Sequence, residues 1–230
     1  MNKVTNIGGV FFKAKDVAKL NEWYKTQLGF KITEWGASMV WGDVDRSNSA
    51  PCQTAWSIFK DDTKYLDPGT APFMINYRVH DLKELIDVLR SEGVTIAGGI
   101  DEYDYGKFAW ILDPEGRKIE LWQPIDSGFG EAPPVWDEKV TGLAAVYLRS
   151  DDPLNIKDWY KKHLGVSEGF KQVDLLSNKE VLVRWDVLDK SDKIFSDTDK
   201  PFVYSYRVKE NISPTPITDP EGNKIILTQP

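Results

Sequence analysis

The chain has 230 residues, of which 41% are hydrophobic and 28% are charged, and its formal net charge is −7. This composition is typical of a globular protein with one large domain or two small ones, which needs no metal or disulfide to form a core. The negative balance and the scattered Lys and Arg residues argue against nucleic acid and anionic membranes as partners.

The single cysteine, Cys52, excludes an intrachain disulfide. The first residues lack the long apolar run of a signal peptide. No segment approaches the roughly 18–20 apolar residues of a membrane span. We therefore expect a cytoplasmic protein without a membrane partner.

Hydrophobic periodicity predicts strands and two helices within residues 1–124. The first helix, 17–28, is expected to end at Gly29. The second, 82–92, has apolar residues at helical spacing, with Asp81 as a plausible N-cap and Gly93 after its end. "DPEG" predicts a turn before the last strand. The predicted strands are 4–13, 30–35, 39–44, 53–60, 73–79, 108–112 and 118–122.

The sequence contains an internal repeat. Residues 4–16 align with 140–152, 23–29 with 159–165, 72–79 with 201–208, and 113–124 with 219–230. The last pair, "DPEGRKIELWQP" and "DPEGNKIILTQP", is identical at nine of twelve positions. The offsets fall from 136 to 129 to 106, so the second copy is shorter by 136 − 129 = 7 and then by 129 − 106 = 23 residues.

The larger deletion removes the segment that forms the second helix in the first copy. "KENISPTP" stands in its place, and its two prolines oppose a helix. We therefore predict a complete domain over 1–124, a linker over 125–135, and a truncated domain over 136–230 that lacks its second helix. In the first copy the elements follow a βαβββ pattern twice.

Three segments of the first copy resemble the glyoxalase, bleomycin-resistance and extradiol-dioxygenase superfamily, also called vicinal oxygen chelate proteins. They are "GGVFFKAKDVAKLNEWYKTQLGF", "FMINYRVHDLKELIDVLRSEGV" and "YGKFAWILDPEGRKIELWQP". The resemblance implies an α+β fold in which paired βαβββ modules form a curled mixed sheet. The curled sheet makes a cup, and helices cover its outside.

Metal-dependent members of that superfamily hold a divalent ion in the cup. The resemblance places the ligand positions of this chain at Gly9, Met74 and Glu120. Of these only Glu120 supplies a hard donor, and the second copy has Ala145, Val203 and Ile226 at the same places. One carboxylate does not hold a divalent ion against water, so we expect neither a metal nor another cofactor.

Side chains alternate across a strand, which assigns a set of residues to the cup. Glu120 shares a face with Lys118 and Trp122, while Ile119 and Leu121 face the other way. The same rule places Met74, Asn76 and Arg78 together, with Phe11 on the first strand. Tyr103, Asp104 and Tyr105 are candidates for the entrance, although a tyrosine-rich loop can also serve packing alone. The candidate ligand-binding residues are Phe11, Met74, Asn76, Arg78, Glu120 and Trp122.

Two interpretations of Glu120 remain open. The carboxylate could form a buried ion pair with Arg78 that fills the old metal site, because an isolated buried charge is very costly. It could instead anchor a ligand in an apolar pocket, or act as a general base. His80 and His163 are both expected at the surface.

Three functions follow from these interpretations. The first is a metal-free protein that binds a small molecule in the cup of the first copy. The second is an enzyme of the superfamily, a lyase, isomerase or dioxygenase, with Glu120 as its catalytic base or its sole retained metal ligand. The third is a structural pseudo-dimer with no ligand. Homodimerisation is a further alternative, because the truncated copy lacks a helix and its sheet needs another surface to cover it.

Overall fold

The computed structural model describes residues 4–42, 44, 51–79, 81–112, 118–124, 140–175, 178–195, 200–208, 217–218 and 224–228. The first copy contributes β1 (Asn6–Ala14), α1 (Val17–Trp23), a π-helical turn (Tyr24–Leu28), β2 (Ala37–Trp41), β3 (Cys52–Lys60), β4 (Phe73–Arg78), α2 (Leu82–Ser91), β5 (Asp101–Tyr103), β6 (Gly106–Leu112) and β7 (Lys118–Pro124). The second contributes β8 (Val140–Ser150), α3 (Pro153–Leu164), β9 (Gly169–Asp174), β10 (Lys179–Asp189), a 3-10 turn (Lys193–Phe195), β11 (Phe202–Val208), β12 (Ile217–Thr218) and β13 (Lys224–Thr228).

These strands form two mixed sheets of the same design. The first has the order β2-β3-β1-β4-β7-β6-β5, and the second has the order β12-β13-β11-β8-β10-β9. In both, the first strand of the copy pairs in parallel with one neighbour and antiparallel with the other: β1 with β3 and β4, β8 with β10 and β11. The predicted α+β class and the repeated mixed sheet are therefore confirmed.

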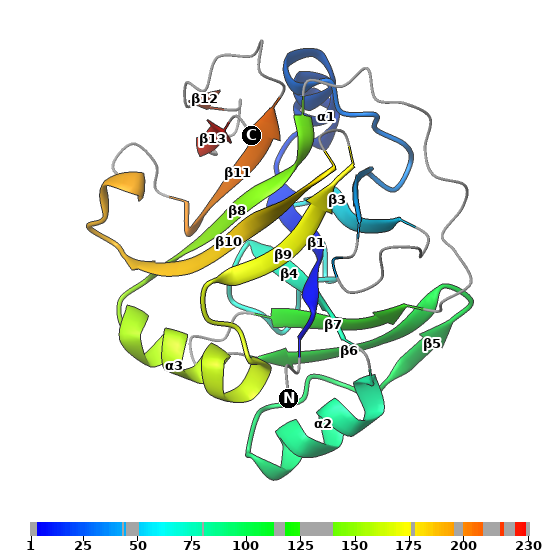
Figure 1. Ribbon diagram of the computed structural model, residues 1–230, viewed down its shortest axis with the longest axis vertical. Helices are drawn as coiled ribbons and strands as arrows, with labels where there is room; N and C mark the ends of the chain where they lie inside the picture. The colour runs from blue at the N-terminus through cyan, green and yellow to red at the C-terminus, as the bar shows by residue number, and fades with distance from the viewer. Residues whose placement is uncertain are drawn as a thin grey trace.

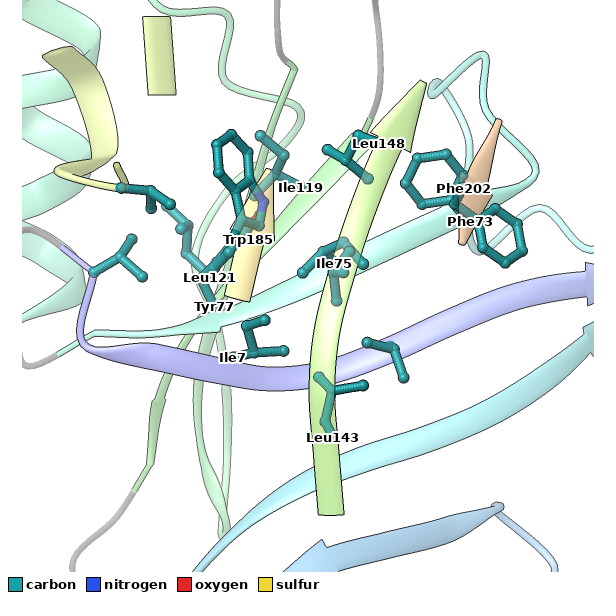
Figure 2. Close-up of a cluster of buried hydrophobic side chains, with 14 of the residues drawn as sticks. Ile7, Phe73, Ile75, Tyr77, Ile119, Leu121, Leu143, Leu148, Trp185 and Phe202 are labelled. Atoms are coloured by element: carbon teal, nitrogen blue, oxygen red, sulfur yellow. The ribbon is translucent and has the colours of Figure 1, made fainter. Parts of the chain in front are cut away.

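The two sheets pack against each other through their apolar faces. In Figure 1 the strands β8 to β11 lie across the sheet that contains β1, β4 and β7. Figure 2 shows Ile75, Tyr77 and Leu121 of the first sheet beside Leu148 and Trp185 of the second, and the cluster they belong to extends through both copies. The face predicted to be apolar is thus covered by the other copy as well as by helices.

Hydrogen bonds also join the copies. The indole Nε1 of Trp56 donates to the hydroxyl of Tyr206 at 3.0 Å inside the shared core. At the sheet edges, Gly42 and Val173 exchange backbone hydrogen bonds of 2.8 and 2.7 Å. His163, expected at the surface, is only 5% exposed, and its Nδ1 lies 2.7 Å from a carboxylate oxygen of Glu92. That expectation was wrong because α3 packs its last turn against the other copy.

The predicted strand at 30–35 does not form. Gly29 ends the first helix in the left-handed conformation, and Phe30 turns directly into the core against Trp56. Thr33 and Gly36 then exchange backbone hydrogen bonds, which close a turn instead of extending a strand. The periodicity of this segment reflected burial of Phe30 rather than strand pairing.

The other elements of the first copy agree with the prediction within a few residues, and the structure adds the short edge strand β5. Four predicted features lie outside the described residues: the DPEG turns, the linker at 125–135, the surface position of His80, and residues 209–216, where a second helix is expected to be missing. The division into a complete and a truncated domain remains a prediction. Within the described parts, no helix is both long and apolar enough to cross a membrane.

Candidate functional site

A cavity of about 770 Å³ lies on the face of the first sheet that points away from the shared core. Along β7, Lys118, Glu120 and Trp122 line this cavity, whereas Ile119 and Leu121 belong to the core, as strand alternation predicts. Of the eighteen described residues that line the cavity, half are aromatic. The lining residues are Gly8, Phe11, Trp35, Gln53, Ala55, Ser57, Phe59, Lys64, Tyr65, Asn76, Asp101, Tyr103, Tyr105, Phe108, Trp110, Lys118, Glu120 and Trp122.

The structure brings together most of the predicted site residues. Phe11, Asn76, Glu120 and Trp122 line the cavity. Met74 lies beneath it, fully buried in a small cluster with Phe11 and Leu66. Arg78 is not among the lining residues. Its guanidinium lies 4.9 Å from the ring centroid of Trp122 and 5.7 Å from that of Trp41.

A β-bulge in β1 shapes one wall. Ile7 pairs with Tyr77 and Gly9 with Asn76, so Gly8 is an extra residue between them. Glycine is required there because a Cβ atom on Gly8 would collide with the amide oxygen of Asn76. The Phe11 ring covers Gly9, since a Cβ atom on that glycine would lie 2.7 Å from Phe11 Cζ. The first position that the resemblance assigns to a metal ligand is therefore closed by an aromatic ring.

Glu120 sits at the floor of the cavity between two strands that supply its partners. Asn76 on β4 and Trp110 on β6 stand directly opposite it in the strand pairing. Asn76 Nδ2 donates to Glu120 Oε1 at 2.6 Å, while Trp110 Nε1 and the Tyr65 hydroxyl donate to Oε2 at 2.7 and 2.6 Å. The residue is 1% exposed. Burial raises the pKa of the Glu120 carboxyl, and the three hydrogen bonds and Lys118 oppose that rise.

The ion pair between Glu120 and Arg78, one of the two interpretations left open by the sequence, does not form. Arg78 points to the same side of β4, but its guanidinium stacks on tryptophan rings instead of reaching the carboxylate. Three neutral donors satisfy Glu120 in its place. Asn76 Oδ1, by contrast, is buried and has no hydrogen-bond partner among the described residues.

Tyr65 is the site residue that sequence reasoning missed. It lies in the loop between β3 and β4, where its ring stacks on Phe59 at a centroid distance of 5.1 Å. The neighbouring Leu66 is fully buried and holds the loop in the cup. Burial, followed by the nearby Glu120 charge, raises the pKa of the Tyr65 phenol. No strand or helix period marks a loop residue, so only the tertiary structure reveals this contact.

Lys118 lies beside Glu120 on β7 and is 8% exposed. Its Nζ donates to the backbone oxygen of Tyr65 at 2.7 Å, and it lies 4.9 Å from the Trp110 ring centroid and 5.4 Å from that of Tyr65. Burial lowers the pKa of the Lys118 amine, and the charges of Glu120 and Asp67 only partly oppose that shift.

Aromatic rings also surround the mouth of the cavity. Tyr103 and Tyr105 stack with their planes 7° apart, and both line the cavity as predicted for the entrance. Trp35 is 54% exposed, and Tyr65 is exposed as well. Of the seven exposed large hydrophobic or aromatic residues in the described part of the chain, these four gather at one opening. The mouth is therefore an exposed aromatic surface continuous with the cavity wall.

The residues around Glu120 do not fit a divalent ion. The indole Nε1 of Trp110 has no free lone pair, and it points its hydrogen at the carboxylate. The amide nitrogen of Asn76 also points a hydrogen at the carboxylate. Met74 offers only a soft thioether, which is packed among apolar groups. Within the described ranges, no group of three or more His, Cys, Asp or Glu residues could hold a metal.

The family model for the Glyoxalase/Bleomycin resistance protein/Dioxygenase superfamily matches residues 7–121, the region that builds this cavity. The chain belongs to this superfamily. The resemblance found in the sequence is thus confirmed. No curated protein sequence matches the chain.

Solved structures of the superfamily share the fold over the whole chain. The Mn(II)-bound glyoxalase from Novosphingobium aromaticivorans matches with a TM-score of 0.64 at 13% identity, covering 100% of this chain and 83% of that one. Homoprotocatechuate 2,3-dioxygenase from Arthrobacter globiformis matches with 0.63 at 13%, covering 100% and 80%. The 2,3-dioxygenase LapB from Pseudomonas sp. KL28 matches with 0.60 at 14%, covering 100% and 93%. At these identities the likeness concerns the fold alone.

Proposed function

We propose that this superfamily member binds a small aromatic molecule in the cavity of its first copy, without a divalent metal ion. The observation that carries the proposal is the cavity itself, whose volume of about 770 Å³ and nine aromatic side chains match the usual form of a small-molecule site. Aromatic walls favour a flat ligand, because offset-stacked and edge-to-face ring pairs add to the energy of apolar burial.

The state of Glu120 supports the metal-free part of the proposal. Its two oxygens accept three hydrogen bonds from N–H and O–H groups, which occupy the directions that a cation would need. In this role Glu120 positions the cavity walls, because it fixes the phenol of Tyr65 and the indole of Trp110. The ligand would then contact the aromatic faces and the other polar side chains that line the cavity.

A second candidate is an enzyme in which Glu120 moves a proton. The observation in its favour is that burial raises the pKa of this carboxyl, because shifted pKa values are common among groups that transfer protons. Against it, the two carboxylate oxygens already accept hydrogen bonds from Asn76, Tyr65 and Trp110. If the wild-type protein converts a ligand, and Glu120→Gln still binds that ligand but no longer converts it, the result would favour the enzyme.

The second copy has a structural role in this proposal. Its sheet covers the apolar face of the first sheet, and the described residues that line the cavity all come from the first copy. A pseudo-dimer with no ligand at all predicts that the cavity binds nothing specific. The binding experiment below separates the two functions.

The experiment is a thermal-shift screen of small aromatic compounds on protein dialysed against EDTA, followed by calorimetric titration of the hits. A ligand that binds only the native state raises the melting temperature. Trp35→Ala should weaken binding at least several-fold, because Trp35 lines the cavity. Leu154→Ala is the matched control, since Leu154 is 76% exposed and lies outside the cavity lining.

Two results would contradict the proposal. One is binding that needs a stoichiometric metal ion and disappears after EDTA treatment. The other is a hit whose affinity falls equally in Trp35→Ala and Leu154→Ala, because that ligand would not use the cavity. Both substitutions are at exposed side chains, so neither should change stability by more than about 0.5 kcal/mol.

A further inference from the structure

We propose that Lys118 is the anchor for a carboxylate group on the aromatic ligand. The inference rests on the proposed function, because it names the chemical class of the molecule that the cavity takes. An aromatic acid would place its ring among the aromatic walls and its carboxylate against the Lys118 ammonium.

The first observation is that this ammonium has spare donors. A lysine ammonium carries three N–H groups. Among the described residues, the Lys118 ammonium makes one hydrogen bond, to the backbone oxygen of Tyr65 at 2.7 Å. The residue is 8% exposed and lines the cavity, so little water is available to the other two groups except through the cavity.

The second observation is that no described carboxylate forms an ion pair with Lys118. Glu120 is close enough to act on its charge, but the oxygens of Glu120 accept from Asn76, Tyr65 and Trp110 instead. The charge of Asp67 and cation–π contacts with the rings of Trp110 and Tyr65 supply the remaining compensation. A buried charge is usually paired, and here the ligand is the partner that completes the pair.

The lowered pKa of the Lys118 amine agrees with this geometry, since it shows that the positive charge is incompletely compensated in the free protein. A bound carboxylate would favour the charged amine and so raise its pKa. Charge-assisted hydrogen bonds are about twice as strong as neutral ones, which is why an acid should bind better than its neutral amide.

Lys64 provides a matched control within the same cavity. It also lines the cavity, but its side chain is exposed and its ammonium lies 3.7 Å from a carboxylate oxygen of Asp67. An exposed ammonium keeps its water and gains little from a ligand carboxylate. If net positive charge alone attracted acids, Lys64 and Lys118 would matter equally.

The test titrates 2-naphthoate, 2-naphthamide and 2-naphthylmethylamine, which share one ring system and differ in charge, into the full-length protein. We expect the acid to bind at least about tenfold more tightly than the amide, and the amine more weakly than both. Lys118→Met should bring the acid and amide affinities together. Lys64→Met should keep the preference. In the wild type the preference should fade as the pH rises through the lowered pKa of Lys118.

The outcomes separate the two proposals. If the amide or the amine binds as tightly as the acid, or if the preference survives in Lys118→Met, the anchor is refuted while aromatic binding stands. If none of the three probes binds and no aromatic compound of the screen does, the proposed function itself fails and the anchor with it. Where the Lys118 variant does not fold, a preference for the acid that survives in Lys64→Met and fades as the pH rises through the lowered pKa of Lys118 supports the anchor, and equal binding of acid and amide by the wild type refutes it.

Discussion

Replacing Glu120 with isoleucine, the residue at the aligned position 226 of the second copy, tests whether the carboxylate organises the cavity. The change leaves the amide of Asn76, the phenol of Tyr65 and the indole of Trp110 without their acceptor. A buried donor without a partner costs about 1–3 kcal/mol. Asn76 is only 2% exposed and should meet that full cost, while Tyr65 and Trp110 can turn towards the cavity and regain water.

These contributions sum to roughly 3–5 kcal/mol for the three donors, taken at the lower end for the two that reach water. Burial of the apolar isoleucine side chain offsets about 2 kcal/mol. The free energy of unfolding should therefore fall by about 1–3 kcal/mol, and the melting temperature by about 2–12 °C for a chain of this size. Urea unfolding, followed by tryptophan fluorescence, measures the first quantity, and scanning calorimetry the second.

Glu120→Gln is the matched control. Its amide oxygen still accepts from Tyr65 and Trp110, and its amide nitrogen can donate to Asn76 once the Asn76 side chain rotates. We expect a loss of about 1 kcal/mol or less at neutral pH. Equal losses for Glu120→Ile and Glu120→Gln, or no loss in either, would refute the account of Glu120 as the acceptor for three donors.

The pH dependence gives an independent check. Because burial raises the folded pKa of Glu120 above its unfolded value of about 4.3, the folded state binds more protons between those two values. The contribution of Glu120 to stability therefore falls as the pH rises through that interval. Glu120→Gln removes this contribution, so its stability relative to the wild type should improve from about pH 4 towards neutrality. A change in the opposite direction would mean that the hydrogen bonds outweigh burial.

Two further predictions concern the contact between the copies. Tyr206→Phe should destabilise the protein by about 1–3 kcal/mol in urea unfolding, because it leaves the buried indole N–H of Trp56 without its acceptor. Tyr204→Phe should be neutral or stabilising, because the buried Tyr204 hydroxyl has no partner among the described residues, and equal losses would contradict this reading. Residues 1–124 expressed alone should aggregate or self-associate, as should 136–230, since each exposes the apolar face that the other covers. A monomeric, cooperatively folding fragment in sedimentation and thermal melting would contradict the shared core.

Strand alternation was enough to predict which face of the first sheet forms the cavity. It placed Phe11, Asn76, Glu120 and Trp122 correctly, because the period of two residues holds wherever one face is buried. It also placed Arg78 on the right side of β4, but a sequence cannot show where a long side chain ends. The Arg78 guanidinium lies against the rings of Trp41 and Trp122 and not beside the Glu120 carboxylate.

Contacts between segments distant in the sequence were beyond prediction. Tyr65 reaches Glu120 from a loop 55 residues away, and Glu92 and His163 come from different copies. The segment 30–35 was read as a strand because burial of Phe30 in the shared core mimics the apolar side of a strand. In each case the residue contacts a partner on a different element of the fold, so the local sequence pattern does not predict the contact.

The central claim is that the cavity takes its ligand without a metal ion, and a crystal structure tests it most directly. Crystals would be grown from protein incubated with an excess of Mn²⁺ and an aromatic ligand from the screen, and anomalous diffraction would locate any manganese. The account predicts ligand density among the aromatic walls, no anomalous peak near Glu120, and hydrogen bonds from Asn76, Tyr65 and Trp110 to its carboxylate. An anomalous peak within coordination distance of Glu120, with Tyr65 and Trp110 displaced from it, would contradict the claim.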